Sequence, residues 1–231
     1  LGWLIWFTKD AVLDKLQRHA SLGYAMVALF ILEAWFFASM AGFAQTDAMD
    51  ILKTALGGHV VLILLAMRRV NMEAVNELME DKGIDDIYIA RPPLTNLAIF
   101  TVITFTIVEF FYPYNSALGW LGLAAGAAIL AITSDYNLKD KFILNQPYVI
   151  YLSLVFIMIA VGYAFMGWDI LSNKGANINH FRHFITSGGY GLAYLMVMII
   201  IGWIHTGRHL TSNIYTHLMV FFMLLASIMR G

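Results

Sequence analysis

Seven histidines are the residues of this chain best suited to chemistry, and they are His19, His59, His180, His183, His205, His209 and His217. The chain has no cysteine, which excludes disulfides, iron–sulfur clusters and thiolate ligands. Imidazole is the usual protein ligand of haem iron and copper. The histidines therefore predict a haem or copper site, for which methionine, tyrosine and carboxylate groups are the other available ligands.

Three of these histidines, His205, His209 and His217, flank a single predicted tight turn near the end of the sequence. His19 is expected at the same depth on another helix. A haem with two imidazole ligands, or a copper ion with two or three, could form there. The alternative is that each histidine only anchors a helix end among the lipid headgroups.

A second pair of histidines, His180 and His183, is expected at the opposite membrane boundary. The pair has i,i+3 spacing, which suits either a metal site or an ordinary polar loop. His183 and His205 are 22 residues apart on one predicted helix. At 1.5 Å per residue they are separated by ~33 Å, so they cannot share a metal.

Glu33 and His59 are expected near the middle of two successive apolar stretches that a short loop joins. An ionisable group inside a membrane costs several kcal/mol unless it is paired or lies in a water-filled cavity. Each of these two residues is therefore a candidate functional residue. The two residues could form a structural pair, relay protons, or orient an imidazole that binds a metal, with Glu33 as its hydrogen-bond partner. Glu109, toward the outer end of its stretch, is expected to reach the interface.

The elements that carry these residues must lie in a membrane. The 231 residues are 60% hydrophobic and 13% charged, with a mean hydropathy of +0.73. Soluble domains carry about 25% charged residues, so a soluble enzyme, a nucleic-acid-binding protein and a disordered chain are excluded. No nucleic-acid partner is expected, and the lipid bilayer is the expected surroundings.

Apolar runs near the length that crosses ~30 Å of hydrocarbon predict about seven transmembrane helices. These runs cover 21–43, 51–67, 94–112, 116–133, 147–168, 184–204 and 211–229. The fold class is therefore all-α, a polytopic transmembrane helical bundle. Residues 21–231 are expected to form one domain, preceded by an interfacial segment or the end of an upstream span over 1–20, without a signal peptide.

Basic residues predict the orientation, because they gather on the cytoplasmic side. With a cytoplasmic N-terminus, ten of the fourteen Lys and Arg residues fall on the inner side. The longest connection, 68–93, then faces the cytoplasm. Apolar residues at helical spacing predict an amphipathic helix over 70–82, which either lies at the headgroups or docks a partner.

Several motifs resemble the NnrS family of bacterial membrane proteins. These are His183 followed by Gly188 and Gly191, the His-Thr-Gly-Arg segment 205–208, and Gly57-Gly58-His59 followed by the basic-Asn turn 68–71. The resemblance extends over about residues 50–231, which corresponds to the C-terminal half of a longer family member. Ile200 stands where the family usually has Arg, His59 replaces an Arg, and the Trp-His…His-Glu-Met motif of the family's N-terminal half is absent.

The resemblance implies an inner-membrane protein that binds haem, of b type, or copper, and that is linked to nitric-oxide and denitrification stress. His205, His183 and Arg208 are the positions that carry over, with Gly188 and Gly191 permitting a flat cofactor to approach. His19, His59, His209 and His217 are candidate further metal ligands. Arg208 could pair with a haem propionate, an anionic substrate or a lipid phosphate.

Two other functions fit the sequence. One is a cofactor-free accessory subunit of a larger membrane respiratory or monooxygenase complex, which an amphipathic docking helix and the lack of a soluble domain would suit. The other is a transporter, for which the glycines at 188–191 are the only feature resembling a broken helix. Whether the chain is an enzyme is left open by the sequence.

Overall fold

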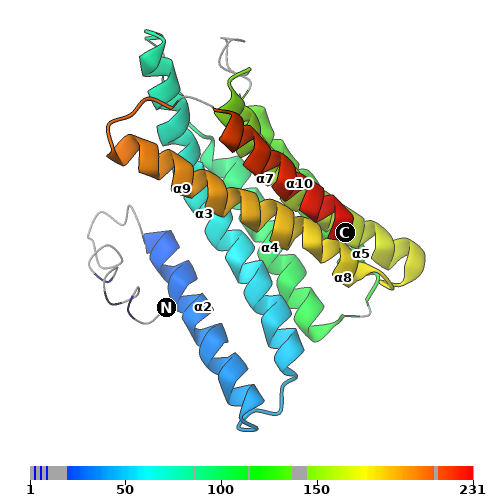
Figure 1. The fold of residues 1–231 in the computed structure, drawn as a ribbon. Helices are drawn as coiled ribbons and strands as arrows, with labels where there is room; N and C mark the ends of the chain where they lie inside the picture. The colour runs from blue at the N-terminus through cyan, green and yellow to red at the C-terminus, as the bar shows by residue number, and fades with distance from the viewer. Residues whose placement is uncertain are drawn as a thin grey trace.

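The fold was analysed in a computed structural model, which describes residues 3, 6, 9, 20–85, 87–113, 115–136, 145–210 and 213–230. These residues form helices and no strand, which confirms the predicted all-α membrane bundle (Figure 1). The first part comprises α2 (Ala20–Met40), α3 (Ala48–Asp81), α4 (Pro92–Phe111), α5 (Ala117–Ile132) with the 3₁₀ turn η1 (Thr133–Tyr136), and α7 (Pro147–Asn173). His19 lies outside the described residues.

The last part is one long helical run followed by a shorter helix. The run consists of α8 (Ile178–His183), the π-helical segment η2 (Phe184–Tyr190) and α9 (Gly191–His205), and it is followed by α10 (Ile214–Arg230). In the described part of the chain, six helices are long and apolar enough to cross a membrane. The predicted seventh span corresponds to α10, whose 17 residues are near the lower limit for crossing.

The structure has one helix where the sequence predicted a transmembrane span and a separate amphipathic helix. α3 continues unbroken for 34 residues, about 51 Å at 1.5 Å per residue, so its last turns extend beyond the hydrocarbon. Their apolar face, with Ala74, Val75, Leu78 and Met79, is buried in the bundle's own core. The helix therefore neither floats at the headgroups nor offers this face to a partner.

Close helix packing holds the centre of the bundle together. Gly119, Gly122 and Gly126 of α5 lie against α7, and a Cβ on Gly122 would come within 2.9 Å of the Gly167 Cα. Membrane helices associate through such small residues because lipid provides no hydrophobic force between them. α5 and α7 therefore form the rigid centre on which the other helices pack.

Two helices at the edges are less enclosed. α2 lies along α3, with Trp35 also against Phe110 of α4 at 5.6 Å between ring centroids (Figure 1). α10 packs mainly on η2, and α9 and α10 diverge toward their connection, 206–213 (Figure 1). Both edges leave grooves that face the lipid.

Candidate functional site

The end of α9 carries the His-Thr-Gly-Arg segment that the sequence singled out. α9 ends at His205, and Gly207 has a φ of 65°, a left-handed conformation that favours glycine and turns the chain away from the helix. The side chains of His205 and Arg208 are exposed. Among the described residues, no hydrogen bond to either side chain is found, so both groups are available to a ligand.

The other two histidines of the predicted cluster have separate partners. His209 Nδ1 lies 2.7 Å from a carboxylate oxygen of Asp81, which ties the α9–α10 connection to the end of α3. His217 Nδ1 forms a hydrogen bond with the Tyr151 hydroxyl, which ties α10 to α7. The expected tight turn is instead an eight-residue connection between diverging helices, so the three imidazoles do not converge.

No group of three His, Cys, Asp or Glu side chains suited to a metal is found in the part of the chain that the structure describes. A copper ion held by three of the described imidazoles is therefore not assembled at this end. Haem has a weaker requirement, since one axial imidazole can hold it in an apolar slot.

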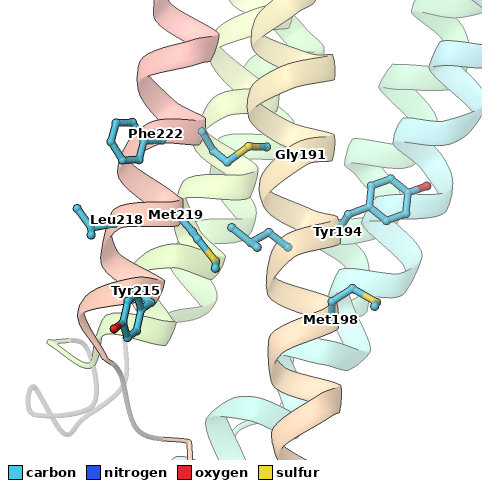
Figure 2. Close-up of a pocket in the computed structure, with 9 residues that line it drawn as sticks. Gly191, Tyr194, Met198, Tyr215, Leu218, Met219 and Phe222 are labelled. Carbon is cyan, nitrogen blue, oxygen red and sulfur yellow. The ribbon is translucent and has the colours of Figure 1, made fainter.

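An apolar groove lies between α9 and α10 (Figure 2). Its volume is about 660 Å³, within the range of cofactor pockets. The groove is lined by Gly191, Tyr194 and Met198 of α9 and by Tyr215, Leu218, Met219 and Phe222 of α10, which are labelled in Figure 2. The lining offers aliphatic and aromatic walls, thioethers and phenols.

Helical periodicity places His205 in line with this groove. Met198 and His205 are seven residues apart, which is nearly two full turns, so they lie on one face of α9. Gly191, at the other end of the same face, presents only backbone to the groove, where a Cβ would meet the Met223 methyl. Ile200, which stands where the resembled family usually has Arg, is buried in the core and does not face the groove.

The end of the bundle near α8 holds an ion pair between Arg182 and Glu109. Their side chains are 11% and 8% exposed. The expectation that Glu109 reaches the interface is therefore wrong, because the Arg182 guanidinium of α8 neutralises it inside the bundle. His180 is exposed and His183 half-buried, on either side of Arg182.

The π-helical segment η2 was not predicted. π segments inside helices are rare and occur frequently at functional sites. Gly188 and Gly189 pack on Met158 and Ile159 of α7, so Gly188 serves helix contact at this point. The Tyr190 hydroxyl donates a hydrogen bond to the Leu56 carbonyl oxygen of α3. The adjacent glycines were the only signal in the sequence for this irregularity.

Glu33 and His59 lie together, as their positions on neighbouring spans predicted. Both line a crevice of about 320 Å³ between α2 and α3. His59 Nδ1 lies 2.8 Å from the Ala55 carbonyl oxygen of its own helix. The crevice contributes one imidazole and one carboxylate, which is too few groups for a closed metal site.

A further cluster, where the segment after α3 meets η1, was not predicted from the sequence. Arg91 Nε lies 2.5 Å from an oxygen of Asp135, whose side chain is 1% exposed. Tyr88 stacks on Tyr136 with 6.0 Å between ring centroids. Burial, together with the nearby Asp135 carboxylate, raises the pKa of the Tyr88 phenol, and Arg91 opposes this. This cluster joins the segment that precedes α4 to η1.

Comparison with known families gives one match. The family model described as "NnrS protein" matches residues 1–231, the whole chain, and so extends beyond the 50–231 that the motifs had suggested. Neither a curated protein nor a solved structure matches the chain.

Proposed function

This chain belongs to the NnrS family of integral membrane proteins, and on that premise we propose that it binds b-type haem through His205 in the α9–α10 groove. We further propose that it acts in nitric-oxide and denitrification stress in the bacterial inner membrane. The supporting observation is a 660 Å³ apolar groove whose α9 face continues, two turns beyond Met198, to the exposed imidazole of His205, with the exposed Arg208 just after the end of that helix.

The residues present fit a haem group. The apolar walls of the groove suit a macrocycle, and Gly191 lets a flat ring approach the backbone of α9. His205 would provide the axial imidazole, and Arg208 would pair with a propionate at the aqueous edge. Met198, Met219 and Met223 carry thioethers that could serve as a second ligand. A bound haem would supply reversible one-electron chemistry and affinity for nitric oxide.

His183 is a less favoured ligand in this proposal. It lies at the other end of the Ile178–His205 run, beside the Arg182–Glu109 pair, and does not line the groove. If it holds a cofactor, that cofactor occupies a separate site in the outer leaflet. Copper is the second candidate cofactor, and it would need ligands beyond the described histidines.

The test is the ultraviolet–visible spectrum of the detergent-purified protein, oxidised and dithionite-reduced, with metal analysis of the same sample. A Soret band that sharpens on reduction and shifts with nitric oxide supports the proposal. His205→Ala should lose most of the haem, whereas the matched exposed imidazole variant His180→Ala should keep it. Full haem content and an unchanged spectrum in His205→Ala would show that the ligand assignment is wrong.

A featureless spectrum without bound metal would instead favour the cofactor-free accessory subunit. That alternative had depended partly on an amphipathic docking helix, and the core of the bundle covers the apolar face of this helix. Co-purification at fixed stoichiometry with an oxidase, reductase or monooxygenase would support it.

A further inference from the structure

The crevice between α2 and α3 is separate from the α9–α10 groove and shares no lining residue with it. Its polar groups are Glu33 and His59, and its walls include Phe36, Phe37 and Leu52. Phe37 and Leu52 are 62% and 51% exposed on the lipid-facing surface of the bundle. A ligand would therefore enter this crevice from the bilayer.

The hydrogen bonding of His59 determines which of its ring nitrogens is free. The Ala55 carbonyl can only accept a hydrogen bond, so Nδ1 of His59 must carry the proton. In the neutral imidazole, Nε2 is then an acceptor. Tyr190 lies beside the ring at 6.1 Å between centroids, and its hydroxyl is already bonded to the Leu56 carbonyl oxygen. Nε2 is therefore left for a partner that the crevice would hold.

Glu33 needs a partner for a stronger reason. It is the fourteenth of the 21 residues of α2, near the middle of an apolar helix, and its side chain is exposed. No hydrogen bond or ion pair to Glu33 is found among the residues that the structure describes. A carboxyl group without a hydrogen-bonding partner in hydrocarbon costs several kcal/mol of free energy. A hydroxyl group of a ligand could donate a hydrogen bond to it and so reduce this cost.

The remaining lining restricts the class of ligand. Among the residues that line the crevice, none is Lys or Arg. Phospholipid phosphates and fatty-acid carboxylates would therefore meet Glu33 without a compensating cation, which disfavours them. The Phe36 and Phe37 side chains suit a flat ring, and about 320 Å³ suffices for one or two fused rings.

We propose that this crevice binds the ring of a lipid-soluble quinol or quinone, with Glu33 and His59 as its two hydrogen-bonding partners. A quinol carries two hydroxyl donors, and the carboxylate and the imidazole Nε2 are two acceptors. The oxidised ring has two carbonyl acceptors and no donor, so the acceptors on Glu33 and His59 favour the quinol form. The proposal concerns binding and does not depend on haem in the α9–α10 groove.

The test is equilibrium binding of decylubiquinol and of reduced 2-methyl-1,4-naphthoquinone to the protein in lipid nanodiscs, followed by titration calorimetry. Saturable binding near one ligand per chain is expected. Glu33→Gln and His59→Leu should each raise the Kd about tenfold, as expected when one strong hydrogen bond to the ligand is lost. Glu33→Gln changes an exposed position, so it remains informative if His59→Leu fails to fold.

The matched control is Thr104→Val on α4. The Thr104 hydroxyl bonds the Phe100 carbonyl oxygen of its own helix at 2.8 Å and does not line the crevice, so its loss should leave the Kd unchanged. The proposal is overturned if no saturable quinol binding occurs, or if both crevice variants bind like the wild type. Binding of the lipophilic cation tetraphenylphosphonium without quinol binding would also overturn it, because Glu33 would then act as a simple counter-ion.

Discussion

Some ionisable side chains of this protein have an ion-pair or hydrogen-bond partner within the fold, and others do not. Arg182 and Glu109 neutralise each other inside the bundle, and Asp81 engages His209 at the surface. His205, Arg208 and Glu33 have no such partner among the described residues. At the residue scale, this difference separates side chains that hold the structure together from those available to ligands.

The buried Arg182–Glu109 pair predicts a large loss of stability when one charge is removed. Glu109→Gln leaves the Arg182 guanidinium uncompensated, and breaking such a pair costs about 3–5 kcal/mol. We expect a clear fall in the thermal unfolding midpoint in detergent. The double variant Glu109→Gln/Arg182→Met should recover part of this loss.

Asp50→Asn is the matched control for this prediction. Asp50 pairs with Lys53 near the same end of the bundle, but their side chains are 40% and 30% exposed. Exposed pairs contribute about 0–1 kcal/mol, so the midpoint should hardly move. Equal effects of Glu109→Gln and Asp50→Asn would contradict the structural role assigned to the buried pair.

The raised pKa of Tyr88 predicts a loss of stability at alkaline pH. A folded-state pKa above the unfolded value of about 10 means that the neutral phenol stabilises the fold below pH 10. This contribution declines as the pH rises from 10 toward the folded-state pKa, by up to about 1.4 kcal/mol per pH unit. Tyr88→Phe should therefore show a smaller fall in the unfolding midpoint between pH 9 and 11, measured by differential scanning.

Tyr112→Phe is the comparison for Tyr88→Phe. Tyr112 is 65% exposed in the turn after α4, outside the buried cluster that holds Tyr88. An alkaline profile of Tyr88→Phe identical to those of Tyr112→Phe and the wild type would show that Tyr88 does not contribute to the pH dependence.

At the scale of elements, α3 has two roles along one continuous helix. Its first part crosses the hydrocarbon, and the 84–91 segment packs on its last turns. Asn76 holds that segment, since its amide donates to the Tyr88 carbonyl oxygen at 3.2 Å and accepts from the Tyr88 N–H at 2.7 Å. The helix extension and the loop therefore form one unit.

Asn76→Ala is expected to detach the 84–91 segment from the end of α3 without unfolding the membrane helices. The two Tyr88 backbone groups would lose their partners, at a cost of about 1–3 kcal/mol for each group left buried. Hydrogen exchange should increase over residues 84–91, with little change in α5 and α7. Asn179→Ala, which removes an exposed amide on α8, should leave this exchange unchanged. Unchanged exchange in Asn76→Ala would mean that other contacts hold the segment.

At the scale of the whole molecule, the exposed aromatic surface fits a bilayer. Phe100, Trp120 and Trp168 are each about two-thirds exposed at 66%, 66% and 65%, which suits contact with lipid. Within this bundle α5 and α7 form a tight centre, and the edge helices α2 and α10 border the two lipid-facing grooves. The proposed ligand sites therefore lie at the periphery, where a membrane-dissolved molecule can enter.

The orientation predicted from basic residues can be tested because the chain has no cysteine. Single cysteines introduced as Asp85→Cys and Ala176→Cys occupy exposed positions in connections at opposite ends of the bundle. A membrane-impermeant maleimide added to intact cells should label Ala176→Cys and spare Asp85→Cys, and cell lysis should expose the latter. The reverse pattern would place the N-terminus outside.

The sequence by itself determined the fold class, the family and the positions of most membrane helices, because hydrocarbon imposes a long apolar signature on every span. It also placed Glu33 beside His59, since a short loop makes successive spans neighbours. Only the tertiary structure decided which ionisable groups meet across distant spans, such as Glu109 with Arg182 and Asp81 with His209. Helix rotation, crossing angle and divergence decide these contacts, and they depend on packing between segments that local sequence patterns do not encode.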